Sequence, residues 1–190
     1  MKFQIIAALP FAMLASGAAG QDYQTALTTF YETNMRALST APELVSAASA
    51  ANAARAGIDQ ATIDGLDAAW QAELGTADTP TITPILSNPA ADFLRSQVTA
   101  SGGKIVEAFI TDAVGLNVAA SEATSDMWQG DEAKFTEVFP AGPDAVLYGA
   151  VEMDESTQTY QAQISIPLVD PSSKTVVGTL TFGLNAETLF

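Results

Sequence analysis

The stretch that decides the fold begins Lys104-Ile-Val-Glu-Ala-Phe-Ile-Thr-Asp112, passes through Ala-Val-Gly115 and continues as Leu116-Asn-Val-Ala-Ala-Ser121. After Gly103 the hydrophobic period changes to two, which is typical of strands, and Gly115 lies where the chain must turn. The stretch therefore predicts strands at 104–112 and 115–121, joined by a short turn.

Three more strand-like runs follow at 145–153, 158–168 and 175–184, and turn-forming residues at 154–157 and 170–173 separate them. Because short connections favour antiparallel neighbours, we expect the last three strands to form a meander. In the run 158–168, alternate residues give one apolar face and one polar face. The polar face contains Gln161, Gln163 and Ser165.

Residues 22–101 predict helices instead. A first helix is indicated by apolar residues at helical spacing, namely Leu27, Tyr31, Met35 and Leu38. The run Thr40-Ala-Pro-Glu43 has the pattern of a capping box with Pro42 in the first turn. It predicts a second, Ala-rich helix over 41–55.

Two further helices are expected before the strands begin. One runs from Thr62 to a stop at Gly75, and the next opens at Asn88-Pro89, with Asn as cap and Pro at the first position. Residues 76–88 contain Pro80, Pro84 and several threonines, so we expect a loop there. Helices over 22–101 followed by five antiparallel strands over 104–184 define an α+β fold class.

The composition excludes several kinds of chemistry. The chain contains no His and no Cys, which excludes a Ser-His-Asp or Cys-His nucleophile system and a Cys/His zinc site. We expect no cofactor and no enzymatic activity. The formal net charge of −15 disfavours nucleic acid as a partner.

Residues 1–20 have the pattern of a secretory signal peptide. Lys2 is followed by an apolar run, and Ala18-Ala19-Gly20 offers small residues for cleavage. We expect a single mature domain at 21–190 in the periplasm, without membrane insertion after cleavage. The alternative is a retained membrane anchor, although the run is short for a spanning helix and Pro10 interrupts it.

Three features of the region 104–184 carry a family resemblance. They are the unit Phe109-Ile-Thr-Asp-Ala-Val-Gly-Leu-Asn-Val-Ala119, the segment Thr124-Ser-Asp-Met-Trp-Gln-Gly-Asp131 before a short helix at 132–138, and the closing pair Ile164-Ser-Ile-Pro-Leu-Val-Asp170 and Val176-Val-Gly178. In this order and spacing they resemble the Cache family of extracellular sensor domains, also called PDC domains. The resemblance implies a leading helix along a PAS-like five-stranded sheet. It also implies a pocket between the other sheet face and the segment that links the second and third strands.

The resemblance and the residue types together give six candidate ligand-binding residues. Trp128 is expected either to form a flat pocket wall or to be buried for packing, and Tyr148 matches a pocket tyrosine of the family. Asp126 either grips an amine or cation or holds its own loop, and Asp131 either does the same or caps the helix at 132–138.

Lys134 and Gln163 complete the candidate set. Lys134 is expected to pair with a ligand carboxylate, or with Glu137 or Asp131 on a solvated helix face. Gln163 is expected on the pocket floor or on an ordinary wet sheet face. The arginine clamp of the amino-acid-binding subgroup is missing, because Asp126 stands at the matching position.

The sequence therefore favours a periplasmic sensor module that binds a small-molecule metabolite. We expect the module to work without a transmitter domain of its own, so a membrane receptor or a kinase is the expected signalling partner. The alternative is a periplasmic adaptor that binds another protein and takes no small ligand.

Overall fold

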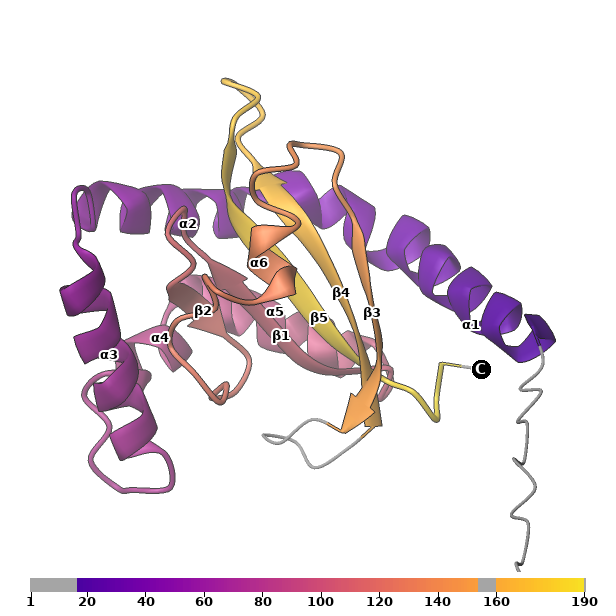
Figure 1. Cartoon of the computed structure of the whole chain (residues 1–190), viewed down its shortest axis with the longest axis horizontal. Helices are drawn as coiled ribbons and strands as arrows, with labels where there is room; N and C mark the ends of the chain where they lie inside the picture. The colour runs from indigo at the N-terminus through magenta and orange to yellow at the C-terminus, as the bar shows by residue number, and fades with distance from the viewer. Residues whose placement is uncertain (1–16, 154–159, 190) are drawn as a thin grey trace, which may run out of the picture.

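The computed structural model of the chain describes residues 17–153 and 160–189 (Figure 1). Most of the predicted signal segment and the predicted turn at 154–157 lie outside these residues. The helical elements are α1 (Gly17–Phe30), a π-helical turn η1 (Tyr31–Met35), a 3-10 turn η2 (Arg36–Thr40), α2 (Pro42–Ala54), α3 (Gln60–Glu73), α4 (Ile82–Leu86), α5 (Pro89–Ala100) and α6 (Ala133–Thr136). The strands are β1 (Ile105–Thr111), β2 (Asn117–Ala120), β3 (Leu147–Met153), β4 (Tyr160–Val169) and β5 (Val176–Asn185).

The five strands form one antiparallel sheet with the order β2-β1-β5-β4-β3. The strands β3, β4 and β5 are consecutive neighbours, which confirms the expected meander. The α+β fold class predicted from the sequence is also confirmed, because the helices come first and the antiparallel strands follow.

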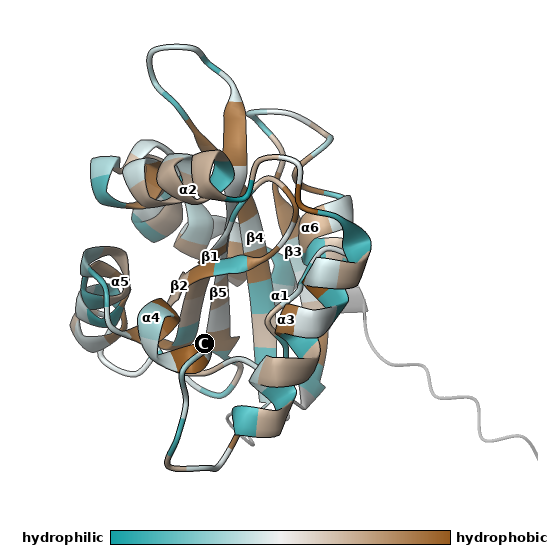
Figure 2. Cartoon of the chain, turned by 90° about the vertical axis from the view of Figure 1, so that its left-hand side faces the viewer, coloured by the Kyte–Doolittle hydropathy of each residue, from teal (hydrophilic) through white to brown (hydrophobic). Residues whose placement is uncertain are grey.

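One face of the sheet is covered by α2 and α5, while α3 and α6 lie on the opposite side (Figures 1 and 2). The covered face holds the main core, where Leu27, Met35 and Leu94 pack with Ile164 and Phe182, all completely buried. Burial of each such side chain contributes roughly 1.5–3 kcal/mol, so this layer supplies most of the stability.

A second, smaller core lies on the other face at the β1–β2 end of the sheet. Trp70 of α3, Phe109 of β1, Leu116 and Met127 meet there. This cluster covers β1 and β2, whereas the same face of β3 and β4 carries polar residues and faces open space. The uneven cover is what creates a cleft.

The first predicted helix differs from the expectation. The spacing of Leu27 to Leu38 suggested continuous α-helix, but the winding widens at Tyr31 and tightens at Arg36. Side chains compete for the carbonyls of the last α-turn, since Thr33 Oγ1 donates to Thr29 O and Asn34 Nδ2 donates to Phe30 O. Such back-bonding bends helices, and it explains the change of winding.

Two other local predictions are wrong. The capping box at Thr40 does not form, because Ala41 is the N-cap of α2 and no side chain caps it. The expected loop at 76–88 contains α4, and the carboxylate of Glu73 accepts the backbone N–H groups of Thr81 and Ile82 at its start. In contrast, Asn88 caps α5 as predicted.

No helix within residues 17–153 and 160–189 combines the length and the apolarity that crossing a bilayer requires.

Candidate functional site

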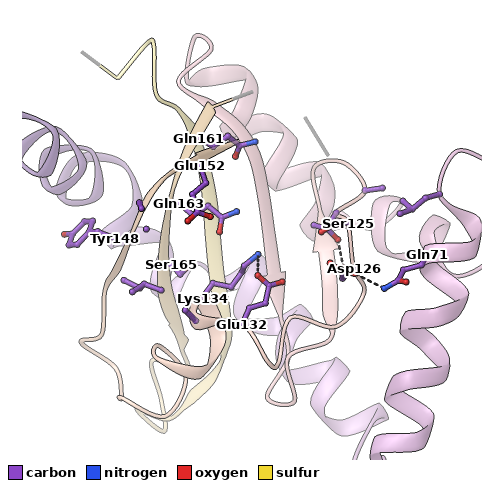
Figure 3. A pocket seen from close by; sticks show the side chains of 17 residues that line it. Gln71, Ser125, Asp126, Glu132, Lys134, Tyr148, Glu152, Gln161, Gln163 and Ser165 are labelled. Atoms are coloured by element: carbon purple, nitrogen blue, oxygen red, sulfur yellow. Dashed lines mark hydrogen bonds and ion pairs between the residues drawn. The ribbon is translucent and has the colours of Figure 1, made fainter. Parts of the chain in front are cut away.

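A cleft of about 1130 Å³ lies between the polar part of the sheet and the α3 side of the molecule (Figure 3). Five elements or segments build it: α3 with Gln71, the linking segment (residues 121–132) with Asp126, α6 with Lys134, β3 with Glu152 and β4 with Gln163. Its volume is slightly above the usual range of small-molecule sites, and polar and apolar groups contribute about equally to its lining.

The floor of the cleft comes from alternate residues of β4. Gln161, Gln163 and Ser165 point to this side, while Ala162 and Ile164 between them lie in the main core. The hydroxyl of Ser165 shares a hydrogen bond of 2.8 Å with that of Thr181 on β5. The polar face predicted from the sequence is therefore the floor of a cleft.

Three residues outside the linking segment fix its path. The indole N–H of Trp70 donates to Thr124 O at 2.8 Å, and Asp67 Oδ1 accepts the backbone N–H of Met127 at 2.9 Å. Asn117 Nδ2 donates to Thr124 Oγ1 at 2.7 Å and to the carbonyl of Asp126 at 2.9 Å. These bonds hold the cleft wall in one conformation.

Asn117 also joins this wall to a buried ion pair. Its backbone carbonyl accepts from the guanidinium of Arg55 at 3.2 and 3.3 Å, and Arg55 Nη1 lies 2.6 Å from Asp112 Oδ2. The side chain of Asp112 is fully buried, and its second oxygen accepts the backbone N–H groups of Val114 and Leu116. The end of α2 is thus tied to the wall through one continuous set of bonds.

The predicted residues Asp126, Gln163 and Lys134 line the cleft together. Asp126 Oδ1 accepts from Gln71 Nε2 at 2.8 Å, a partner on α3 that the sequence did not suggest. Lys134 pairs with Glu132 at 2.9 Å, so the expectation of Glu137 or Asp131 as its partner is corrected. The short helix begins one residue later than expected, which places Glu132 beside the lysine.

Trp128 and Asp131 are placed elsewhere. The indole N–H of Trp128 donates to Val114 O at 2.8 Å, its ring lies against Gly130, and it is not among the lining residues. Of the two alternatives for Trp128, a pocket wall or a side chain buried for packing, this arrangement corresponds to packing. Asp131 is exposed and outside the lining, and it is not the helix cap, because Glu132 takes the N-cap position without a side-chain bond.

Tyr148 contributes to the cleft wall, but its ring points away from the cleft (Figure 3). The ring packs against the main core and meets Tyr31 edge-on. Its register explains the orientation, since Tyr148 lies opposite Ile164, a residue of the core face. A ligand in the cleft would therefore contact the strand around Tyr148 rather than its phenol.

Several cleft residues were missed by the sequence analysis, and the polar side chains of Gln71, Glu132 and Glu152 are among them. Glu152 pairs in register with Gln161, so the strand pairing across the predicted turn at 154–157 could have placed it on the polar face. Gln71 gave no signal, because only the tertiary fold brings α3 to the linking segment.

The residues that the structure describes contain no group of three or more acidic side chains arranged to hold a metal ion. The arrangement can instead offer amides, a hydroxyl and carboxylates to a polar organic molecule.

The comparisons with known proteins found no matching family model and no matching curated protein. Among solved structures, the sensory domain of the Campylobacter jejuni chemoreceptor Tlp3 with isoleucine bound is 12% identical, with a TM-score of 0.41, over 88% of this chain and 64% of that one. The sensor domain of the V. cholerae histidine kinase DctB is 11% identical, with a TM-score of 0.40, over 90% and 58%. The E. coli DcuS sensor domain is 16% identical, with a TM-score of 0.42, over 68% and 96%.

The chain spans less than two thirds of the length of the first two of these structures. All three of these solved structures are sensory or sensor domains.

Proposed function

We propose that this chain is a sensor module that binds a small molecule in the cleft between β3, β4 and the linking segment. The observation that carries the proposal is the contrast between the two faces of β4. Ala162 and Ile164 serve the core, while Gln163 presents an amide to the cleft with no hydrogen-bond partner among the described residues. A sheet face built only for packing has no use for such a group.

The bonding of the linking segment supports the same function. Trp70, Asp67 and Asn117 hold the wall of the cleft from three different elements, so the polar groups on it are positioned before a ligand arrives. A preorganised site loses less entropy on binding than a mobile one.

The sequence supports a further proposal on location and partners. We infer that residues 1–20 direct export, that the module works in the periplasm, and that a membrane receptor or kinase receives its signal. We assign it no catalytic role, since the cleft combines carboxylates with amides and hydroxyls, and the hydroxyl of Ser165 on its floor is already bonded to Thr181.

The test is thermal unfolding of the protein against a panel of amino acids, organic acids, amines, sugars and purines. A ligand at a hundred times its dissociation constant stabilises the folded state by about 2.7 kcal/mol. For a chain of this length, the midpoint is expected to rise by roughly 5–10 °C.

A Gln163→Ala variant is expected to lose this shift. Gln97→Ala on α5, behind the sheet, is the matched control and is expected to keep it. A panel without any stabilising compound would contradict the proposal and favour the adaptor alternative, which crosslinking to partner proteins would then test.

A further inference from the structure

The charge of Lys134 is already neutralised within the protein. Its Nζ atom lies 2.9 Å from Glu132 Oε2 and 3.0 Å from Gln129 Oε1, and 5.4 Å from the centre of the Phe109 ring. The side chain is 15% exposed. An ammonium group has three hydrogens to donate, and Glu132 and Gln129 accept two of them. A ligand carboxylate that approached this lysine would also meet the carboxylate of Glu132.

Two carboxylates of the cleft are not neutralised in this way. The side chain of Glu152 on β3 makes no hydrogen bond or ion pair with any described residue, and it lies close to Gln163 (Figure 3). Asp126 accepts from Gln71 through Oδ1, and its other oxygen has no donor among the described residues. Figure 3 shows the two side chains on opposite walls of the cleft.

The balance of charge in the cleft is therefore negative. Its described lining contains three carboxylates and one ammonium, and the ammonium is paired with one of the three. The whole chain carries a formal charge of −15, which adds a long-range attraction for cations.

We propose that the ligand is a small organic cation that carries one or two amines, held between Asp126 and Glu152 and hydrogen-bonded by Gln163. This inference rests on the proposed function, because it assigns a ligand class to the same cleft. Amines donate to carboxylate oxygens with short, charge-assisted bonds, and both walls offer such acceptors. Dicarboxylates would instead meet two uncompensated negative charges.

The experiment compares linear compounds of equal length that differ only at their ends. Calorimetric titration uses the full chain with α,ω-diamines, ω-amino acids and α,ω-diacids of four and of six carbons. At one chain length or both, the diamine is expected to bind at least about tenfold more tightly than the amino acid, with the diacid weakest. Its affinity is expected to fall as salt is raised, because screening weakens the attraction. Tighter binding of the diacid or the amino acid, or no binding of any diamine, would overturn the inference.

Charge-neutralising variants locate the effect. Glu152→Gln and Asp126→Asn are each expected to weaken diamine binding about tenfold, since each removes one carboxylate from the cleft. Glu43→Gln on α2 makes the same change of net charge at an exposed site behind the sheet, and it is expected to leave the affinity unchanged. Glu152 is itself exposed, so its variant keeps the fold even where Asp126→Asn disturbs the bond to Gln71. Equal weakening by Glu43→Gln would show that the affinity depends on the net charge of the protein and not on the cleft carboxylates. That result would refute the placement of the ligand between Asp126 and Glu152.

The two proposals fail in different ways. If a neutral or anionic compound binds and Gln163→Ala abolishes its binding, the sensor function stands and the cationic ligand class is wrong. If no compound of any class binds, both are wrong.

Discussion

The rings of Tyr31 and Tyr148 meet edge-on, with their centroids 6.3 Å apart and their planes at 85°. Tyr31 belongs to the π-helical turn that follows α1, and Tyr148 belongs to β3, the strand that forms one wall of the cleft. The register between β3 and β4 shifts just after Tyr148, so this pair lies beside an irregularity in the strand. The leading helix and the cleft wall are thus in direct contact.

The contact between the two rings is expected to add a pairwise contribution to the free energy of unfolding, and this contribution is lost when either ring is removed. Edge-on aromatic pairs contribute about 0.5–1.5 kcal/mol beyond the area they bury. A double-mutant cycle of Tyr31→Leu and Tyr148→Leu, measured by urea unfolding, is expected to give a coupling free energy of about 1 kcal/mol. Strictly additive effects would show that the two rings stabilise the fold independently.

The buried pair of Arg55 and Asp112 is expected to be one of the most sensitive sites in the chain. In Arg55→Met, the carboxylate of Asp112 stays fully buried without its cation, and the backbone of Asn117 loses a donor. The free energy of unfolding is expected to fall by about 3 kcal/mol, the low end for a broken buried pair, because Arg55 is partly exposed to solvent.

The control for this prediction is Arg36→Met. Arg36 also forms an ion pair, with Glu32, but both side chains are well exposed. Its removal is expected to leave the denaturant midpoint nearly unchanged, because exposed pairs contribute little. Similar losses in the two variants would contradict the importance of burial.

Gly115 is expected to resist substitution more strongly than Gly57, although both have positive φ, at +84° and +76°. A side-chain carbon at Gly57 would meet nothing within 4 Å, so Gly57→Ala reports backbone strain alone, about 1–2 kcal/mol. At Gly115 the same atom would lie 2.5 Å from the Cα atom of Gly130. Gly115→Ala is therefore expected to cost a further 1–3 kcal/mol or so, and chemical denaturation of the two variants gives the difference.

The carboxylate of Glu73 is expected to make the region around α4 sensitive to acid. Burial opposes its ionisation, but hydrogen bonds from Thr81 and Ile82 outweigh that effect and lower its pKa below the ordinary value of 4.5. Because the pKa is lower in the folded state, the carboxylate stabilises the fold above pH 4.5 and loses this contribution as the pH falls through the folded-state pKa.

Glu73→Gln tests this dependence. The variant is expected to be less stable than the parent at pH 7 and equally stable once the pH is well below the folded-state pKa. Denaturant unfolding across that range gives the comparison. A stability difference that persists unchanged in acid would mean that the charge of Glu73 has no part in holding α4.

Residue patterns predicted the helices and strands well wherever strand alternation or helix capping alone decided the local structure. The alternation of β4 gave both its core face and its polar face, and Asn88-Pro89 located the start of α5. The prediction failed where hydrogen bonds from particular side chains decided the local structure. The start of α4 depends on Glu73, which lies eight residues before Thr81, and the winding after Phe30 depends on side chains that compete for carbonyls.

The cleft was predictable in part for the same reason. Gln163 followed from strand periodicity, and Asp126 followed from its place in the segment between two strands. The orientation of Tyr148 depends on the register with β4, and the position of Trp128 depends on a bond to Val114. Neither relation is contained in the local pattern, so aromatic character alone could not separate a cleft wall from a packed ring.

The alternation along β4 has a consequence for how new specificity can arise in this protein. Residues of the cleft floor and residues of the main core alternate within the ten residues of β4, so the two sets can be changed separately. A gene library that randomises positions 152 and 163, whose side chains lie close together in the cleft, while retaining Ala162 and Ile164, is expected to yield mostly folded variants. Divergence of ligand preference among duplicated copies would then require few mutational steps and little loss of stability.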